Sequence, residues 1–594
     1  MDDNVLEYSK AYHDEYKQKF NDNATEMFDG WIKESKVNVD ENRKTAKEYR
    51  DAKENLDNLD KRISKYKRLK GFLIFLVVLG FVATAIGALI IYGDCSNIGQ
   101  DFVSDGSTYT GFGLTFWIGV IVAVVGLGLA IGMLVLINKK IKPILADANA
   151  EREKEAQRAK ELLDTCFDQL RPLYSLFRDS ATAQLVQKTV PIIKLDTNFN
   201  MHRFDLLSGK YGLCENLEEN ESTVGVFSGE ILGNPFIEER RLKQEWGTET
   251  YTGSLTIYWT EVETDSEGNV RTVQRSETLY ASVQKPKPYY SYFTHLVYGN
   301  EAAPDLCFTH EPSHAEKMSE KELAKKVKKG EKELAKLEKK ALENGTTFNS
   351  MGNVEFDILF GATDRNHDVQ FRLLFTPLAQ KNMLHLMKTP QPFGDDFYLI
   401  KDHMLNFVAS EHAQDWNFEI DSSDFMFYDI DMCKSAFLDF NNKYFLNLYF
   451  ELAPLMSIPL YQQYKPHEYI YRDNYPRNYT SFEAEVLSNS LDEDLLKHPE
   501  SATRAILKTA LINTDETVDN VLVTAHSFAT VDRVDYVSVY GGDGYYHDVP
   551  VPWVEYIAVE QSTPVGIVEL EGDHNNDYNK SNATKHNLYI TLKD

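Results

Sequence analysis

The stretch GFLIFLVVLGFVATAIGALIIYG, residues 71–93, contains no Asp, Glu, Lys, Arg or His. A helix needs about 20 apolar residues to cross the hydrocarbon core of a bilayer. A second stretch, GFGLTFWIGVIVAVVGLGLAIGMLVLI at residues 111–137, passes the same test. The first stretch begins far from Met1 and is too long for the apolar part of a signal peptide. The sequence therefore predicts two transmembrane helices that form a hairpin.

Basic residues flank this predicted hairpin on both outer sides. They are Lys61, Arg62, Lys65, Lys67, Arg68 and Lys70 before the first span, and Lys139, Lys140 and Lys142 after the second. The connecting loop, residues 94–110, has neither Lys nor Arg. Because cytosolic flanks retain positive charge, we expect a multi-pass protein of the cell membrane with both termini in the cytosol. Sequons such as Asn220, Asn344, Asn478 and Asn582 would suit the opposite orientation.

Small residues recur within the spans at a spacing of four, which lets helix backbones approach closely. The pairs are Ala83 with Gly87, Gly119 with Ala123, and Gly128 with Gly132. We expect them to pack the hairpin, with self-association as the alternative. Neither span carries a charged residue, which disfavours a transporter or a proton relay.

Helical patterns continue from both spans into the predicted cytosolic region. Apolar residues alternate at steps of three and four, as in a coiled-coil seam. The seams are Tyr49, Ala52, Leu56, Leu59, Ile63 and Tyr66, then Leu145, Ala148, Arg152, Ala156, Ala159, Leu163, Cys166, Leu170 and Leu173. They predict an antiparallel coiled-coil stalk. An earlier aromatic stripe, Tyr8, Tyr12, Tyr16 and Phe20, indicates a packing face.

Composition narrows the range of partners for the rest of the chain. The 594 residues include 63 Lys and Arg against 91 Asp and Glu, a net charge of −28, which disfavours nucleic acid. Five scattered cysteines suit a reducing compartment better than a disulfide framework.

The patterns along the chain divide it into five regions. We expect cytosolic helices over 1–70, the hairpin over 71–138, a second stalk helix over 139–188, a β-rich domain over 189–475 with a helical insertion at 313–344, and a C-terminal β-rich domain over 476–594. The predicted fold class is α+β with largely antiparallel sheets.

Turn and cap signals place individual elements in the soluble region. Strand-like residues on either side of 265–269 predict a β-hairpin. Ser319 and Glu322 form a capping box that opens a Lys/Glu-rich helix, although Gly330 weakens its middle. After this helix the pattern predicts a strand from Val354 to Phe360, a turn over 364–368, a strand from Val369 to Phe375, and a helix that begins at Thr376 and Pro377.

This last succession, VEFDILFGATDRNHDVQFRLLFTPLAQKNMLHLM, resembles the prokaryotic membrane family catalogued as domain of unknown function 3137. Phe356, Asp364, Thr376 and Pro377 stand where that family has a phenylalanine strand, an aspartate turn and a Leu-Thr-Pro helix start, and Phe375 replaces the usual Leu. The resemblance extends over residues 40–430 and is strongest over 340–390. It implies two spans, a helical stalk and a cytosolic β-rich domain in a bacterial inner membrane, and it brings no known activity.

Two segments carry possible metal ligands. Cys307, His310 and His314 offer ligands that Zn²⁺ accepts, although no fourth is apparent and Pro312 suggests a plain loop. Alternating Asp and Asn at 573–579 resemble the start of a Ca²⁺ loop, but Tyr578 stands where Gly is needed, so a polar turn is the better interpretation.

No motif in the chain predicts a specific catalytic activity. His547 and Asp548 adjoin a Gly-rich stretch, but neighbouring strand residues point to opposite faces. Nucleophile-elbow, Walker and zinc-protease motifs do not occur. The sequence favours a non-enzymatic scaffold or adaptor with no cofactor, which binds the bilayer and either a protein partner or its own copy. The alternative is a membrane-tethered enzyme, metal-dependent forms included, for which His310, His314, His526 and His547 are the residues to test.

Overall fold

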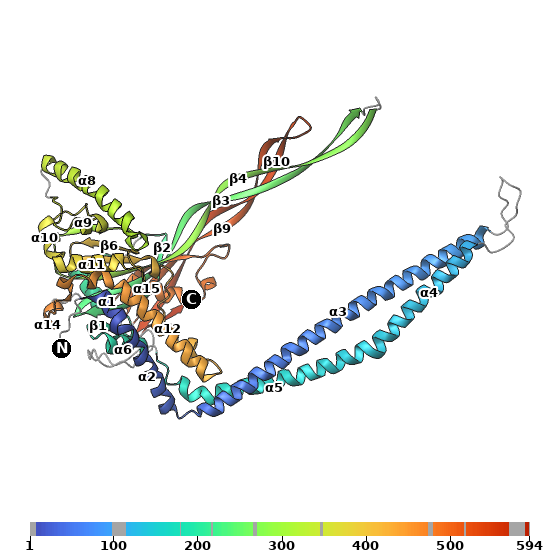
Figure 1. Cartoon of the computed structure of the whole chain (residues 1–594), viewed down its shortest axis with the longest axis horizontal. Coiled ribbons are helices and arrows are strands. Elements are labelled where there is room, and N and C mark those ends of the chain that lie inside the picture. Colours follow the sequence, from blue (N-terminus) through green and yellow to red (C-terminus); the bar gives the residue numbers. More distant parts are fainter. Residues whose placement is uncertain are drawn as a thin grey trace. The chain divides into compact units, whose positions relative to one another are not determined.

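The protein is α+β, and every strand pairing in its described part is antiparallel (Figure 1). The computed structural model describes residues 7–97, 114–178, 180–214, 218–264, 270–344, 348–472, 479–515, 518–569 and 588–592. The chain divides into two units. The sheet unit comprises Met1–Met27, Arg178–Ser422 and Leu438–Asp594, and the helical unit comprises Phe28–Phe177 and Ser423–Phe437.

The helical unit contains two long apolar helical segments. The first is α3, Val39–Asn97, and the second consists of α4, Leu114–Leu136, a π turn and α5, Lys142–Tyr174. Both are long and apolar enough to cross a membrane. Small residues line the contact between α3 and α4. A Cβ on Gly80 would lie 2.7 Å from the carbonyl oxygen of Gly126, and one on Gly87 would lie 2.6 Å from the backbone nitrogen of Ala123.

Large apolar side chains lie on the outside of this helix pair. Their exposed fractions exceed half at Phe72, Phe75, Leu79, Leu89, Trp117, Ile121 and Val124. Of the predicted small-residue pairs, Gly87, Gly119 and Ala123 lie in the α3–α4 contact, whereas a Cβ on Gly128 or Gly132 would meet nothing within 4 Å. The contact between α3 and α4 is therefore made largely by small residues, while many large apolar side chains lie outside it.

The predicted seam residues between α3 and α5 are mostly buried. Ala52, Ile63, Leu145, Ala148 and Ala159 are all less than a tenth exposed. Arg152 instead turns outward, and its Nε lies 2.5 Å from Oδ1 of Asp60. The helical unit also holds a cluster of aromatic rings, Phe28, Trp31, Phe177, Phe425 and Phe437.

A seven-stranded sheet organises the other unit, with strand order β1-β2-β3-β4-β7-β6-β5. Its strands are β1 Ile193–Leu195, β2 Glu221–Ile231, β3 Asn234–Thr264, β4 Val270–Gly299, β5 Cys307–His310, β6 Phe397–Asp402 and β7 Leu405–Ser410. The predicted hairpin is confirmed as the outer part of β3 and β4, although its turn at 265–269 lies outside the described residues.

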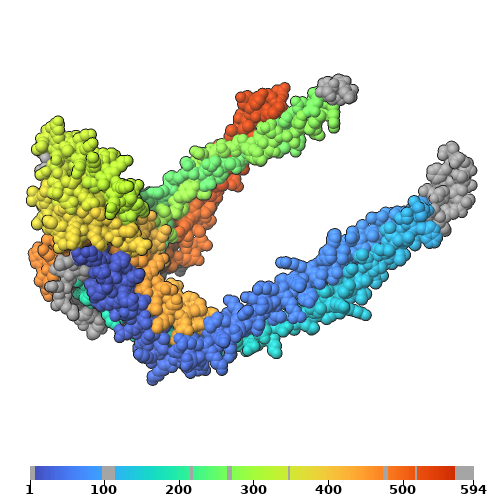
Figure 2. Space-filling view, in the orientation of Figure 1, coloured from blue at the N-terminus to red at the C-terminus, as the bar shows by residue number. Residues whose placement is uncertain are grey.

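A second, four-stranded sheet has the order β11-β10-β9-β8. The strands are β8 Ile506–Asp515, β9 Val518–Tyr540, β10 Tyr546–Glu569 and β11 Leu588–Leu592. Hairpin β9–β10 packs on hairpin β3–β4 through Ile257, Leu279 and Val549 (Figure 2). Gly253 permits this contact, because a Cβ at this position would lie 2.0 Å from the carbonyl oxygen of Pro550. The two packed hairpins are called the β arm below.

Helices of the sheet unit pack around the seven-stranded sheet. Those wholly inside it are α1 Tyr8–Ala11, α6 Ala181–Thr189, α7 Met201–Gly209, α8 Glu320–Asn344, α9 Val354–Phe360, α10 Asp368–Leu374, α11 Pro377–Lys388, α13 Ala453–Met456, α14 His467–Ile470 and α15 Ser481–Asn489. The capping box of α8 is confirmed, since Ser319 and Glu322 each accept the other's backbone N–H. Gly330 gives room to Ile358, because a Cβ at this position would lie 2.6 Å from the Ile358 side chain.

The predicted strands over 354–360 and 369–375 are wrong, because the structure has helices α9 and α10 there. Asn353 accepts the backbone N–H of Phe356, and His367 accepts that of Gln370, so both helices have side-chain caps. The buried rings also recur at the helical spacing of four. Together they form the phenylalanine cluster, which consists of Phe308, Phe356, Phe360, Phe371 and Phe375. The helix start at Thr376 and Pro377 is confirmed.

The aromatic stripe near the N-terminus is a packing face, as predicted. It follows α1, a π turn at Tyr12–Tyr16 and α2, Lys17–Ser35. Tyr8 stacks on Tyr449 and Phe20 stacks on Phe445, both of which lie in α12, Ile430–Glu451. A spacing of four drifts by about 40° per step around an α-helix. The wider π turn offsets this drift.

Candidate functional site

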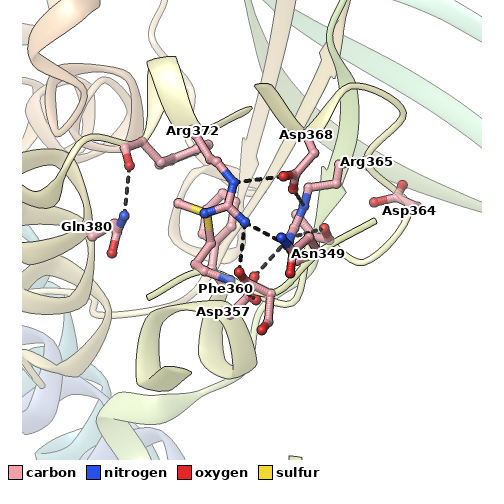
Figure 3. A network of polar contacts seen from close by, with 12 residues as sticks. Asn349, Asp357, Phe360, Asp364, Arg365, Asp368, Arg372 and Gln380 are labelled. Carbon is pink, nitrogen blue, oxygen red and sulfur yellow. Dashed lines mark hydrogen bonds and ion pairs between the residues drawn. The ribbon is translucent and has the colours of Figure 1, made fainter. Parts of the chain in front are cut away.

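A buried arginine fixes the loop between α9 and α10 (Figure 3). Arg365 donates to Oδ1 of Asp357 at 2.8 Å, to Oδ1 of Asp368 at 3.2 Å, and to the carbonyl oxygen of Asn349 at 2.8 Å. Its guanidinium carbon lies 4.4 Å from the ring centre of Phe371. Buried ion pairs are stable only when their hydrogen bonds are made. This network holds the loop at 364–368 in one conformation.

The same loop completes the free edge of β5. Oδ1 of Asp364 accepts the backbone N–H of Thr309 at 3.0 Å, and Oδ1 of Asn366 accepts that of Cys307 at 2.7 Å. The backbone N–H of Asn366 donates to the carbonyl oxygen of Cys307 at 3.2 Å. The loop therefore provides hydrogen-bond partners for the exposed backbone groups of this edge strand. It bonds both the N–H and the carbonyl oxygen of Cys307.

Cys307, Asp402 and His403 form a cluster of possible metal ligands. Cys307 and Asp402 are direct partners across the β5–β6 ladder, so their side chains share a face. Sγ of Cys307 lies 3.5 Å from Oδ1 of Asp402 and 3.5 Å from Nδ1 of His403. Oδ1 of Asp402 and Nδ1 of His403 are 2.7 Å apart. Asp402 and His403 are exposed, and Cys307 is half-buried.

A buried lysine lies behind this cluster on the core side of β6. Nζ of Lys401 donates to the carbonyl oxygen of His403 at 2.5 Å. Burial lowers the pKa of Lys401 to about 7, against the opposite influence of Cys307 and Asp402. The hydrogen bond from Lys401 fixes the turn in which His403 adopts a φ of 55°.

The predicted ligands Cys307, His310 and His314 do not come together. Residues three apart on a strand point to opposite faces, and both ring nitrogens of buried His310 are bonded, one to the carbonyl oxygen of Phe360 at 2.6 Å and one to Asp395 at 3.0 Å. His314 follows the strand and lies 3.6 Å from Glu411. The sequence pattern identifies Cys307 but misses Asp402 and His403. Pairing of β5 with β6 places Asp402 beside Cys307, and His403 is the next residue in the chain.

The other sequence candidates also lie apart from this cluster. His547 pairs with Asp543 at 2.9 Å, while Asp548 bonds Ser538, so His547 and Asp548 form no acid/base pair. His526 lies 3.2 Å from Glu560 on the neighbouring strand. The possible Ca²⁺ ligands at 573–579 fall outside the described residues.

A buried acidic group, which the sequence analysis missed, is formed by one residue of β3 and one of α12. Glu238 of β3 and Glu451 of α12 are fully buried, and their carboxylate oxygens lack hydrogen bonds of ordinary geometry. Burial, and then repulsion from Glu451, raises the pKa of Glu238 well above its usual range. Burial raises the pKa of Glu451 to about 7, although His412 and Ser410 act in the opposite direction.

His412 connects this acidic group to a third carboxylate. Its Nε2 lies 3.8 Å from Glu451, and its Nδ1 lies 2.7 Å from Asp396. Burial lowers the pKa of His412, but the hydrogen bond with Asp396 and the charge of Glu451 outweigh burial and raise it. Two hollows in the described chain lie elsewhere, one lined by Tyr8 and His385 and one on the β arm lined by Gly253 and Pro550. The acidic group therefore adjoins neither of them.

Comparison of the chain with protein-family models, with curated proteins and with solved structures found no match.

Proposed function

We propose that the chain is a membrane-anchored interaction protein, in which α3 and α4 cross the bilayer and the sheet unit binds a protein partner or a second copy on the cytosolic side. In this proposal α3 and α5 continue from the membrane as an antiparallel coiled-coil stalk. The surrounding membrane is the bacterial inner membrane, as implied by the resemblance to the family of domain of unknown function 3137.

The observation that carries the proposal is the inverted packing of α3 and α4. Gly80 and Gly87 of α3 meet Gly126 and Ala123 of α4 at backbone distance, while large apolar side chains point outward. In water this arrangement would expose the apolar surface that normally drives folding. In lipid it is favourable, because helices there associate through close backbone packing and the outer side chains meet acyl chains.

Charge distribution supports the proposed orientation. Lys and Arg flank both outer ends of the helix pair, and the connecting segment at 94–110 has none. Since positive charge is retained on the cytosolic side, this distribution favours a cytosolic sheet unit. Five free cysteines are consistent with such a reducing compartment.

The β arm supports a role in protein interaction. Tyrosine is enriched at protein interfaces because it combines a large apolar ring with a polar tip. Six tyrosines of the arm are at least 60% exposed, namely Tyr258, Tyr280, Tyr536, Tyr540, Tyr545 and Tyr546.

A membrane-tethered enzyme is the second candidate, favoured by one observation. Glu238, Glu451 and His412 are buried groups with shifted pKa values, which are common at active sites. A catalytic group must reach its substrate, and neither the hollow at Tyr8 and His385 nor the hollow on the β arm is lined by these three groups. If the purified chain turns over a substrate and Glu451→Gln abolishes this turnover, the enzyme is favoured over the scaffold.

Alkaline carbonate extraction and thiol labelling of intact cells test the anchor and its orientation. Exposed Cys95 lies at the end of α3 beside the connecting segment, and exposed Cys214 lies in the sheet unit. We expect the chain to stay in the membrane pellet, with an impermeant maleimide reacting with Cys95 but not with Cys214 until the membrane is opened. Cys95→Ser is the control for the first signal and Cys214→Ser for the second. Release by carbonate would refute the anchor, and labelling of Cys214 in intact cells would invert the orientation.

A further inference from the structure

We propose that Cys307, Asp402 and His403 bind one divalent transition-metal ion, with zinc the ion best suited, and leave one coordination position open to solvent. Thiolate, imidazole and carboxylate are the three side-chain ligands that zinc accepts. This site goes beyond the proposed anchoring function and does not depend on it.

Strand pairing places the three ligands on one side of the sheet edge. Cys307 and Asp402 face each other across the β5–β6 ladder. His403 follows Asp402 at the turn between β6 and β7, and its φ of 55° turns the chain back toward β7. The ring nitrogen Nδ1 thereby reaches both Oδ1 of Asp402 and Sγ of Cys307.

The distances agree with a tetrahedral ion. Zn–S bonds of about 2.3 Å and Zn–N bonds of about 2.1 Å, at a tetrahedral angle, place sulfur and nitrogen roughly 3.6 Å apart. Sγ of Cys307 lies 3.5 Å from Nδ1 of His403 and 3.5 Å from Oδ1 of Asp402. The hydrogen-bonded contact between Asp402 and His403, at 2.7 Å, must widen by about 0.6 Å. Both side chains are 62% exposed and have room to move.

The surrounding structure holds the ligands in place without blocking access. The backbone of Cys307 is bonded by Asn366 on both its N–H and its carbonyl oxygen. The carbonyl oxygen of His403 accepts from Lys401, whose amine lies on the opposite, core side of β6. Such fixed supports reduce the cost of ordering a metal site. Three protein ligands with an open fourth position are the arrangement of catalytic rather than structural zinc sites.

Cobalt titration of the full chain tests the site directly. The chain is purified in detergent without a polyhistidine tag and is stripped with a chelator. We expect one Co²⁺ per chain and a near-ultraviolet thiolate-to-cobalt band, and zinc should displace the cobalt. Cys307→Ser should abolish the band, and His403→Ala should weaken zinc binding by more than about 100-fold, a larger loss than that of an outer-shell partner.

Matched controls distinguish this site from non-specific metal binding by other cysteines and histidines. Cys214→Ser removes an exposed cysteine, and His526→Ala removes a histidine that also faces a carboxylate. Neither should change the cobalt band. Asp402→Asn supplies a second variant in case Cys307→Ser misfolds, and it should weaken binding while circular dichroism stays unchanged. A wild-type chain without the band, or equal zinc content in wild type and Cys307→Ser, would overturn the proposal.

Discussion

The α3–α4 helix pair and the phenylalanine cluster are both built from apolar residues, yet they are packed in opposite senses. In the cluster, Phe356, Phe360 and Phe375 are at most 1% exposed. In the helix pair Gly80 and Gly87 lie at the contact, and Phe72 and Phe75 are 58% and 60% exposed. Removal from water holds the cluster together. The helix pair leaves many of its large side chains outside, so in the proposed membrane setting close backbone contact takes over much of this role.

The largest effect is expected where a buried ring is removed from the cluster. Phe375→Ala should lower the free energy of unfolding by about 4 kcal/mol, because it loses transfer energy and leaves a cavity. Leu373→Ala, two positions away at a side chain that is 57% exposed, should change it by less than about 0.5 kcal/mol. Chemical denaturation of the full chain in detergent, followed by circular dichroism, measures both. Equal effects of the two changes would mean that the cluster does not stabilise the sheet unit.

A smaller effect, with the opposite dependence on size, is expected in the helix pair. Gly87→Leu adds a side chain where even a Cβ would lie 2.6 Å from the backbone of Ala123, and it should destabilise the pair by about 2 kcal/mol. Gly128→Leu adds the same side chain where a Cβ would meet nothing within 4 Å. Hydrogen exchange of α3 and α4 amides in detergent should rise only for Gly87→Leu. A matching rise for Gly128→Leu would refute the glycine contact.

The smallest effect concerns charge in the sheet unit and depends on pH. The pKa of Glu238 is raised well above its usual 4.5 by burial and by Glu451, so the folded chain keeps a proton that the unfolded chain releases. Stability therefore falls as pH rises above 4.5. Gln resembles the protonated acid. The melting temperature of Glu238→Gln should therefore equal that of the wild type near pH 5 and exceed it by a few degrees near pH 8.

Glu333→Gln, at a side chain that is 61% exposed on α8, is the control for this comparison. Its melting temperature should follow that of the wild type at both pH values. A Glu238→Gln chain that shows the same pH dependence as the wild type would contradict the proposed protonation of Glu238.

Local signals in the sequence predicted some elements and misassigned others. The apolar stretches, the Ser319 capping box and the Thr376-Pro377 helix start are read from neighbouring residues alone, and the structure has them. The runs at 354–360 and 369–375 predict strands wrongly, because seven apolar-rich residues fit either element. The caps at Asn353 and His367, together with phenylalanines four apart, were the signals that distinguish helices.

The candidate metal site was less predictable for a topological reason. Cys307 and Asp402 lie 95 positions apart, and only the pairing of β5 with β6 makes them neighbours. His310, which shares a short sequence segment with Cys307, points to the other face of the strand. Glu238 and Glu451 are likewise brought together by a strand and a helix from distant parts of the chain. No spacing rule relates such residues before the sheet order is known.

The packing of the N-terminal aromatic stripe has a consequence for biosynthesis. The hydroxyl of Tyr449 donates to the carbonyl oxygen of Tyr8 across a separation of 441 residues. At a typical 5–20 residues per second, α12 leaves the ribosome on the order of 20 to 90 seconds after α1. Throughout that time Tyr8, Tyr12 and Phe20 have no partner from α12. The nascent chain therefore presents an uncovered aromatic surface, and apolar surface exposed in this way is prone to aggregation.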